Sequence, residues 1–250
     1  MTRVATASVS TMGTPTVPAP RVAVRWGLPD ALIAWVIGIV AAVFAAVPFI
    51  GADGTIPESE EVVATLVLLA VQNLAIVGSL VVVSRIKGRG SLRLDFGFAF
   101  VPGDLLWVLA GVGLAVVAGI MVLPITELAG LEDSSQDVVR TFERSAGVLE
   151  KVAVAAGVVL LAPVAEELLF RGILLRSLVR RWSPLVAVNV AALVFALVHV
   201  LGDPGTGYYV PAFLLLGLVS GWRALATGRI GQSVCLHAGF NLLAAVQIIT

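Results

Sequence analysis

The chain has 250 residues, of which 59% are hydrophobic and only 13% charged, and its mean hydropathy is +1.03. Soluble domains carry about 25% charged residues, so this composition excludes an ordinary soluble protein and indicates a polytopic membrane protein. The sequence shows neither a phosphate-binding glycine loop nor a nucleic-acid patch, so we expect no nucleic-acid partner. A single cysteine excludes an internal disulfide.

The first 29 residues are rich in Thr, Ser, Pro, Ala and Val and show no helical or alternating period, which predicts a flexible tail. Seven apolar stretches follow, most of them close to the roughly 20 residues that cross a bilayer core about 30 Å thick. They are 31–50, 62–84, 105–125, 152–175, 184–200, 209–226 and 230–249. The predicted fold is an all-α membrane bundle of about seven transmembrane helices with a polar cavity inside the membrane.

Basic residues collect before the first predicted span and after the second, fourth and sixth, whereas acidic residues dominate the other loops. The positive-inside rule therefore places the N-terminus in the cytoplasm. We divide the chain into a cytoplasmic tail (1–29), three membrane helices with an acidic extracytoplasmic loop (30–151), and a C-terminal membrane domain (152–250).

The stretch 162–175, APVAEELLFRGILL, sets two adjacent glutamates and an arginine in an apolar run. A charged side chain at the centre of a membrane helix costs about 2.5–3.5 kcal/mol, so such a group is a functional-site candidate by default. Glu167 and Arg171 are four residues apart with the acid first, the better orientation for a helical ion pair. Glu166 points about 100° away from that pair and has no such neutralising partner.

A proline, Pro163, interrupts the same predicted helix just before the acids. Because proline has no N–H, it frees the carbonyl of Val159, four residues earlier, from its α-helical hydrogen bond. In a membrane such a carbonyl is tolerated only where protein or a cavity surrounds it.

Both histidines of the chain also lie in apolar runs. His199 shares a helix face with Phe195, and His237 shares one with Asn241, because residues four apart stack one above the other. The motifs EExxxR, FxxxH and HxxxN come from three different predicted helices, and bundle interiors assemble sites from facing helices in this way. We expect one intramembrane polar site.

These three motifs, their order and their membrane setting resemble the CPBP family, which includes the CAAX prenyl endopeptidases and the bacterial Abi proteins. The resemblance covers roughly residues 152–250. It implies an intramembrane endopeptidase that hydrolyses a peptide bond of a membrane-associated protein or peptide. It also implies a multi-pass protein of a bacterial plasma membrane, with the lipid bilayer and the substrate as partners.

A buried glutamate without a partner suits a general base that takes a proton from water, and a histidine across the cavity could hold the same water. A second histidine and an asparagine carboxamide could donate to the developing oxyanion. The resemblance implies the same catalytic roles, with Glu166 and His199 acting on the water and His237 and Asn241 on the oxyanion.

Three further residues are predicted to support the site. On the family pattern Glu167 and Arg171 shape and neutralise it, and Phe195 is interpreted as a packing residue rather than a chemical one.

Zinc is the open alternative for the mechanism, because Glu166, His199 and His237 could form a site with two histidines, one carboxylate and an open position. The absence of HExxH and the donor character of Asn241 favour a metal-free glutamate mechanism without a cofactor. Cys235 is disfavoured as a nucleophile because it precedes His237 by two residues and projects about 200° away from it on a helix.

Two interpretations without proteolysis remain open. Polar residues can hold a membrane bundle together without any chemistry, and an immunity, scaffold or solute-binding protein could keep the same cavity.

Helix geometry also presents a difficulty for a site that contains both Glu166 and His199. Glu166 is about 21 Å from the outer end of span 152–175, and His199 is about 22 Å from the inner end of span 184–200, which predicts different depths.

Overall fold

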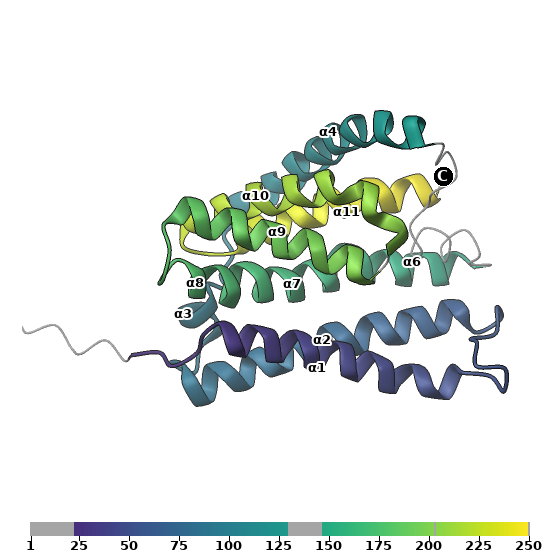
Figure 1. Cartoon of the computed structure of the whole chain (residues 1–250), viewed down its shortest axis with the longest axis horizontal. Helices are drawn as coiled ribbons and strands as arrows, with labels where there is room; N and C mark the ends of the chain where they lie inside the picture. The colour runs from purple at the N-terminus through teal and green to yellow at the C-terminus, as the bar shows by residue number, and fades with distance from the viewer. Residues whose placement is uncertain (1–22, 130–146, 203, 250) are drawn as a thin grey trace, which may run out of the picture.

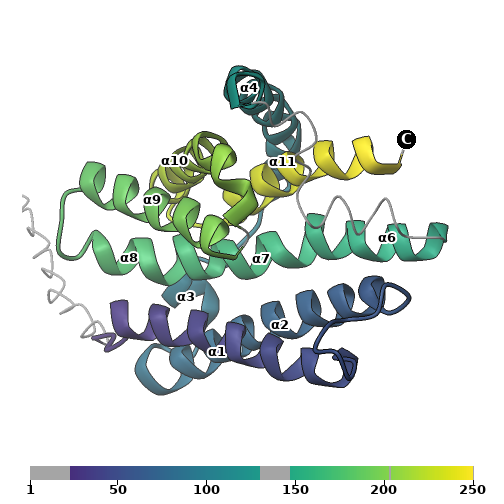
Figure 2. The ribbon, with the colours of Figure 1, turned by 45° about the vertical axis from the view of Figure 1, so that its right-hand side comes forward.

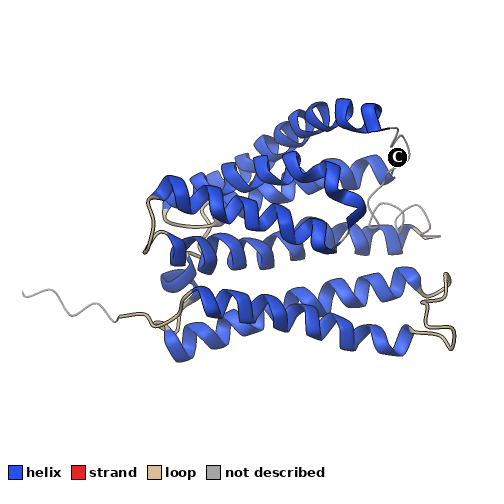
Figure 3. Ribbon diagram, in the orientation of Figure 1, coloured by secondary structure: helices blue, strands red, loops and turns tan. Residues whose placement is uncertain are grey.

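The computed structural model describes residues 23–129, 147–202 and 204–249 (Figure 1). Every regular element in these ranges is helical (Figure 3), so the predicted all-α class is confirmed. Six described stretches are long and apolar enough to cross a membrane. They are Leu28–Phe49, Glu61–Lys87, Pro102–Leu128, Val148–Leu178, Pro184–Gly202 and Thr206–Thr227. The chain is therefore an integral, multi-pass membrane protein.

The seventh predicted span forms α11 (Gly231–Ile249), a helix of 19 residues that is not among these six candidates. It carries Gln232, His237, Asn241 and Gln247, which lower its hydropathy. A helix that contributes polar groups to a buried site loses apolar character for that reason. Most of the predicted tail (1–22) and of the acidic loop (130–146) lies outside the described residues.

The helix that bears the two glutamates, called the site helix below, spans Val148–Leu178. It combines three α-helical segments and two π-helical turns, in the order α6 (Val148–Ala156), η3 (Gly157–Leu161), α7 (Ala162–Glu167), η4 (Leu168–Leu174) and α8 (Leu175–Leu178). Single π-helical turns inside membrane or soluble helices are frequent at functional sites. Here they flank the two glutamates on both sides.

The site helix lies between two groups of helices in Figures 1 and 2. On one side, α1 (Leu28–Ala46) packs against α2 (Glu61–Lys87). On the other side, α9 (Pro184–Gly202) packs against α10 (Val210–Thr227), which also contacts α11. The main hydrophobic core joins residues from both groups to the site helix. The glutamates are therefore held in the middle of the bundle.

Helix α4 (Leu106–Ala129) packs on α11, and two glycines set how closely they approach. A Cβ on Gly111 would collide with the carbonyl oxygen of Leu236, and one on Gly239 would collide with that of Val108. Small residues at such crossings let membrane helices pack backbone to backbone. This crossing positions α11, and with it His237.

The short helix α3 (Leu92–Phe96) connects the α1–α2 pair to the site helix. The fully buried Asp95 carboxylate accepts hydrogen bonds from Ser84 Oγ at 2.6 Å and from Arg89 N and Nε at 2.9 and 3.0 Å. Burial alone would raise the pKa of Asp95, but these hydrogen bonds outweigh it and hold the pKa below its ordinary value. Three short turns complete the fold, η1 (Val47–Phe49), η2 (Pro102–Leu105) and η5 (Pro204–Tyr209).

Candidate active site

The side chains of Glu166, His199 and His237 converge from α7, α9 and α11. Glu166 Oε2 lies 3.6 Å from His199 Nε2 and 3.8 Å from His237 Nε2. This oxygen is buried and has no hydrogen-bond partner among the described residues. The structure thus brings together one residue from each of the three motifs, and we call these three side chains the Glu–His cluster.

The difference in depth that helix counting predicted between Glu166 and His199 is not observed. The site helix continues to Leu178, beyond its predicted end, and a short turn leads from there to α9. Glu166 lies 12 residues before Leu178 and His199 lies 15 residues after Pro184, which corresponds to about 18 and 22 Å from that turn. The two side chains span the remaining difference.

Glu167 points away from Glu166 into a sealed part of the bundle. Its Oε1 accepts hydrogen bonds from Arg171 Nη1 at 2.9 Å and from His237 Nδ1 at 3.0 Å. Arg171 Nη2 also donates to the carbonyl of Gly217 in α10 at 3.3 Å. The predicted ion pair between Glu167 and Arg171 is confirmed, and its link to His237 is a feature that sequence spacing could not show.

The hydrogen-bond partners of the two rings decide which nitrogen faces Glu166. A carboxylate paired with an arginine only accepts, so His237 Nδ1 carries the hydrogen and its Nε2 points to Glu166. His199 Nδ1 lies 2.7 Å from the backbone carbonyl of Phe195, which also only accepts. Both imidazoles therefore present Nε2 to the same carboxylate.

The His199 ring is held between two aromatic rings. Phe195 lies 4.5 Å from it, centroid to centroid, and Phe213 stacks on it at 4.5 Å with an interplanar angle of 29°. Phe195 is fully buried and also lies 4.4 Å from the guanidinium carbon of Arg171. Sequence reasoning missed Phe213, because nothing in the apolar run of α10 distinguishes this aromatic residue from its neighbours.

The site has an accessible side and a sealed side. The side chains of Glu166 and His199 are 23% and 26% exposed, whereas those of Glu167, Arg171 and His237 are at most 3% exposed. The first two side chains are therefore partly exposed at the protein surface, although the Glu166 Oε2 atom is buried. The other three form a frame, linked by hydrogen bonds, behind them.

Asn241 lies one turn beyond His237 on α11, but its side-chain amide makes its hydrogen bond to a group outside the Glu–His cluster. Its Nδ2 donates to the backbone carbonyl of Val158 in η3 at 2.9 Å. The structure therefore places Asn241 against the backbone of the site helix.

The carbonyl affected by Pro163 is Val158, one residue from the predicted Val159. The prediction assumed an α-helix, but in the π-helical turn η3 the N–H of Ala162 donates to Gly157, five residues back. The next donor in this pattern would be residue 163, which has no N–H.

The Glu–His cluster has the chemical composition of a zinc site, with two imidazoles oriented by other acceptors and one carboxylate. In the described ranges, however, no group of three or more His, Cys, Asp or Glu side chains is arranged to hold a metal ion. We therefore derive no step through a metal.

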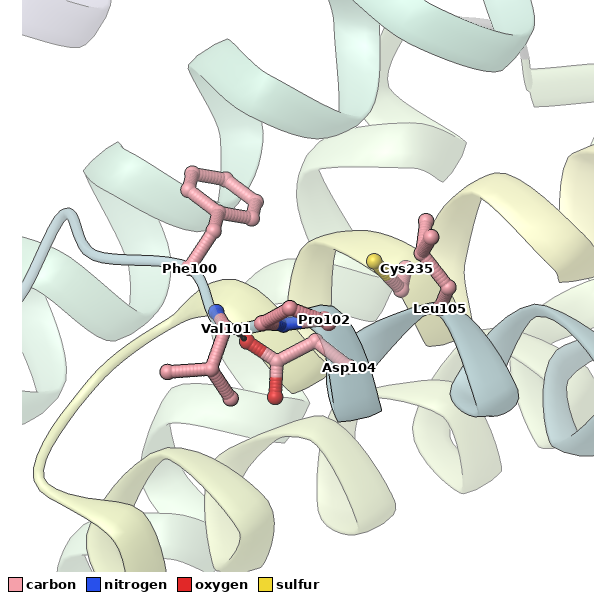
Figure 4. A pocket seen from close by; sticks show the side chains of 6 residues that line it. All are labelled: Phe100, Val101, Pro102, Asp104, Leu105 and Cys235. Carbon is pink, nitrogen blue, oxygen red and sulfur yellow. Dashed lines mark hydrogen bonds between the residues drawn. The ribbon is translucent and has the colours of Figure 1, made fainter.

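Cys235 lies away from the Glu–His cluster. It lines a cavity of about 300 Å³ at the start of α4, shown in Figure 4. The Asp104 carboxylate in this cavity is paired with Arg229. None of the lining residues belongs to the Glu–His cluster; they are Phe100, Val101, Pro102, Asp104, Leu105 and Cys235.

Comparison with known proteins identifies the region that contains the site. Residues 148–243 match a family model described as Type II CAAX prenyl endopeptidase Rce1-like. No curated protein and no solved structure matches the chain. The matched region begins with α6 and ends within α11, so it includes all three motifs. Residues 148–243 are therefore similar to the Rce1-like type II CAAX prenyl endopeptidases.

Proposed function

We propose that the protein is an intramembrane endopeptidase that hydrolyses a peptide bond of a membrane-associated protein or peptide. The observation that carries this proposal is the convergence of Glu166 with the Nε2 atoms of His199 and His237, at 3.6 and 3.8 Å. The family match supports a CAAX-type protease. The roles of individual residues follow from their geometry and chemistry.

In the proposed reaction, water bound on the accessible side is the nucleophile. It donates one hydrogen bond to the Glu166 carboxylate and one to His199 Nε2, which is free to accept because Nδ1 carries the ring hydrogen. Glu166 removes a proton as the water oxygen attacks the peptide carbonyl. The same glutamic acid then gives that proton to the leaving nitrogen as the C–N bond breaks, so the carboxylate is regenerated.

His237 is the proposed donor to the oxyanion of the tetrahedral intermediate. Its Nδ1–H is already given to Glu167, so donation from Nε2 requires the doubly protonated imidazolium. The Glu167 carboxylate, which also binds Arg171, holds the ring in position for this role. Removing an oxyanion donor costs roughly 100- to 1,000-fold in turnover. The family resemblance implies a similar role for Asn241, but only one of its two amide hydrogens is free of Val158.

The proposal is tested by cleavage of a fluorescence-quenched CAAX peptide, with and without a farnesyl group, by the purified full-length protein. Glu166→Gln preserves the shape of the side chain and removes the base, so turnover should be lost while the protein remains folded. The matched control is Glu150→Gln on the same helix, which should cleave like the wild type. Cleavage retained by Glu166→Gln would contradict the assignment, and a wild type that binds peptide without cleaving it would favour a scaffold or immunity function.

We also propose that the reaction uses no metal. The purified protein should hold less than stoichiometric zinc by elemental analysis, and its cleavage should persist in phenanthroline. Activity that is lost on chelation and restored by zinc would instead make Glu166, His199 and His237 metal ligands.

A further inference from the structure

The π-helical turn η3 creates a need for a hydrogen-bond donor next to the site. Ala162 N–H donates to Gly157, and the next position in that pattern, Pro163, has no N–H to offer to Val158. Water is scarce in the membrane interior, so an unpaired backbone carbonyl there is unfavourable.

Asn241 supplies this donor from another helix. Its Nδ2 lies 2.9 Å from the Val158 oxygen. Since a carbonyl oxygen can only accept, the amide has to present its nitrogen there, and this determines the orientation of the side chain.

The bond joins the helix of His237 to the helix of Glu166. Asn241 is one turn from His237 on α11, and Val158 is about two turns before Glu166 on the site helix. Another polar link between the same two helices is the bond from His237 Nδ1 to Glu167. Two links spaced along α11 restrict both its sliding and its rotation against the site helix.

We propose that Asn241 is a positioning residue that acts through Val158. By supplying the donor that Pro163 lacks, it sets α11 against the site helix and thereby sets the distance between His237 Nε2 and Glu166 Oε2. This inference rests on the proposed function of the Glu–His cluster, and it assigns Asn241 a role through its contact with the protein backbone.

The test compares Asn241→Leu, Pro163→Ala and the double variant, as full-length proteins in detergent. Leu removes the amide at similar volume, and Ala at position 163 restores a backbone N–H. Asn241→Leu should lower kcat by up to about 100-fold, as expected for a small misplacement of reacting groups, with KM within about twofold of the wild type. Amide hydrogen exchange should rise in the peptide that covers residues 157–167. In the Pro163→Ala background, the same substitution should change kcat and exchange by no more than about threefold, because the two changes concern one hydrogen bond.

The matched control is Asn189→Leu. The Asn189 amide bonds to the carbonyl of Leu185 on its own helix, so its loss should leave both kcat and exchange in 157–167 unchanged. An equal loss of kcat from Asn241→Leu in both backgrounds, with exchange unaltered, would show an oxyanion donor and overturn the inference. Amide hydrogen exchange in residues 157–167 can be measured without any cleavage assay, so it tests the link to Val158 separately from the proposed function. If Glu166→Gln cleaves like the wild type, the proposed function fails, while unaltered exchange in Asn241→Leu would separately refute the link to Val158.

Discussion

The two glutamates of the EE motif are neighbours in sequence but lie in two different regions of the molecule. Glu166 belongs to the accessible side with His199, and its buried Oε2 has no hydrogen bond among the described residues. Glu167 belongs to the sealed frame, where Arg171 and His237 both donate to its Oε1. Adjacent residues project about 100° apart on a helix, so a step of one residue separates the proposed base from the carboxylate that pairs with Arg171. Substitutions of Glu166 and His199 should therefore lower mainly turnover, and substitutions of the paired Glu167 and Arg171 should lower mainly stability.

The largest expected effect on stability comes from the sealed frame. Glu167→Gln leaves Arg171 without its carboxylate in a region of low dielectric, and breaking a buried pair from one side costs roughly 3–5 kcal/mol. Thermal and denaturant unfolding in detergent should show this loss for Glu167→Gln and much less for Glu166→Gln.

The double variant Glu167→Gln with Arg171→Met removes both charges and should recover part of the lost stability, as expected for coupled neighbours. Equal destabilisation by Glu166→Gln and Glu167→Gln would show that the two regions do not differ, and would favour a purely structural role for both acids.

The next largest effect concerns the accessible side. His199→Gln removes the ring nitrogen that holds the water and should lower kcat by about 100-fold, or about 2.7 kcal/mol. Its unfolding temperature should fall only slightly, through the loss of stacking on Phe213, because this side chain is partly exposed and makes no buried ion pair with the frame. A large fall in stability with unchanged turnover would place His199 in the frame.

A smaller effect is expected outside the membrane spans, at Asp95. Its pKa is lower in the folded than in the unfolded chain, so its contribution to stability is complete above the unfolded value, near 3.8, and is lost as pH falls through the lower folded value. Asp95→Asn should cost about 2 kcal/mol at neutral pH, as expected for lost hydrogen bonds to a charged group. The difference from the wild type should shrink below about pH 4. A difference that is constant from pH 7 to pH 3 would contradict this account.

The smallest effect should arise where the aromatic packing supports His199. Phe213→Leu removes the stacked ring and should cost about 1 kcal/mol, typical of an aromatic pair. Unfolding should show this cost, and kcat should fall by less than about tenfold. A fall as large as that of His199→Gln would indicate that Phe213 itself contacts the substrate.

Much of the fold and part of the site could be predicted from local patterns. Hydropathy located the membrane helices, because crossing a bilayer requires a continuous apolar run of known length. Residue spacing identified the pair of Glu167 and Arg171, because residues four apart meet on a helix whatever surrounds them. Hydropathy was least reliable for α11, where the polar residues that make the site also reduce the membrane signal.

The sequence by itself therefore determined the all-α membrane class and the three motifs, and it predicted that they contribute to one site. Only the tertiary structure decided that His237 bonds to Glu167, that Asn241 bonds to Val158, and that Phe213 stacks on His199. These contacts depend on the height and rotation of one helix against another. Close approach of α4 and α11 at their glycines and the π-helical turns around the glutamates set both quantities. The helical periodicity of one segment predicts only which residues share a face of that helix. It therefore gives no information about the height or rotation of the helix relative to its neighbours.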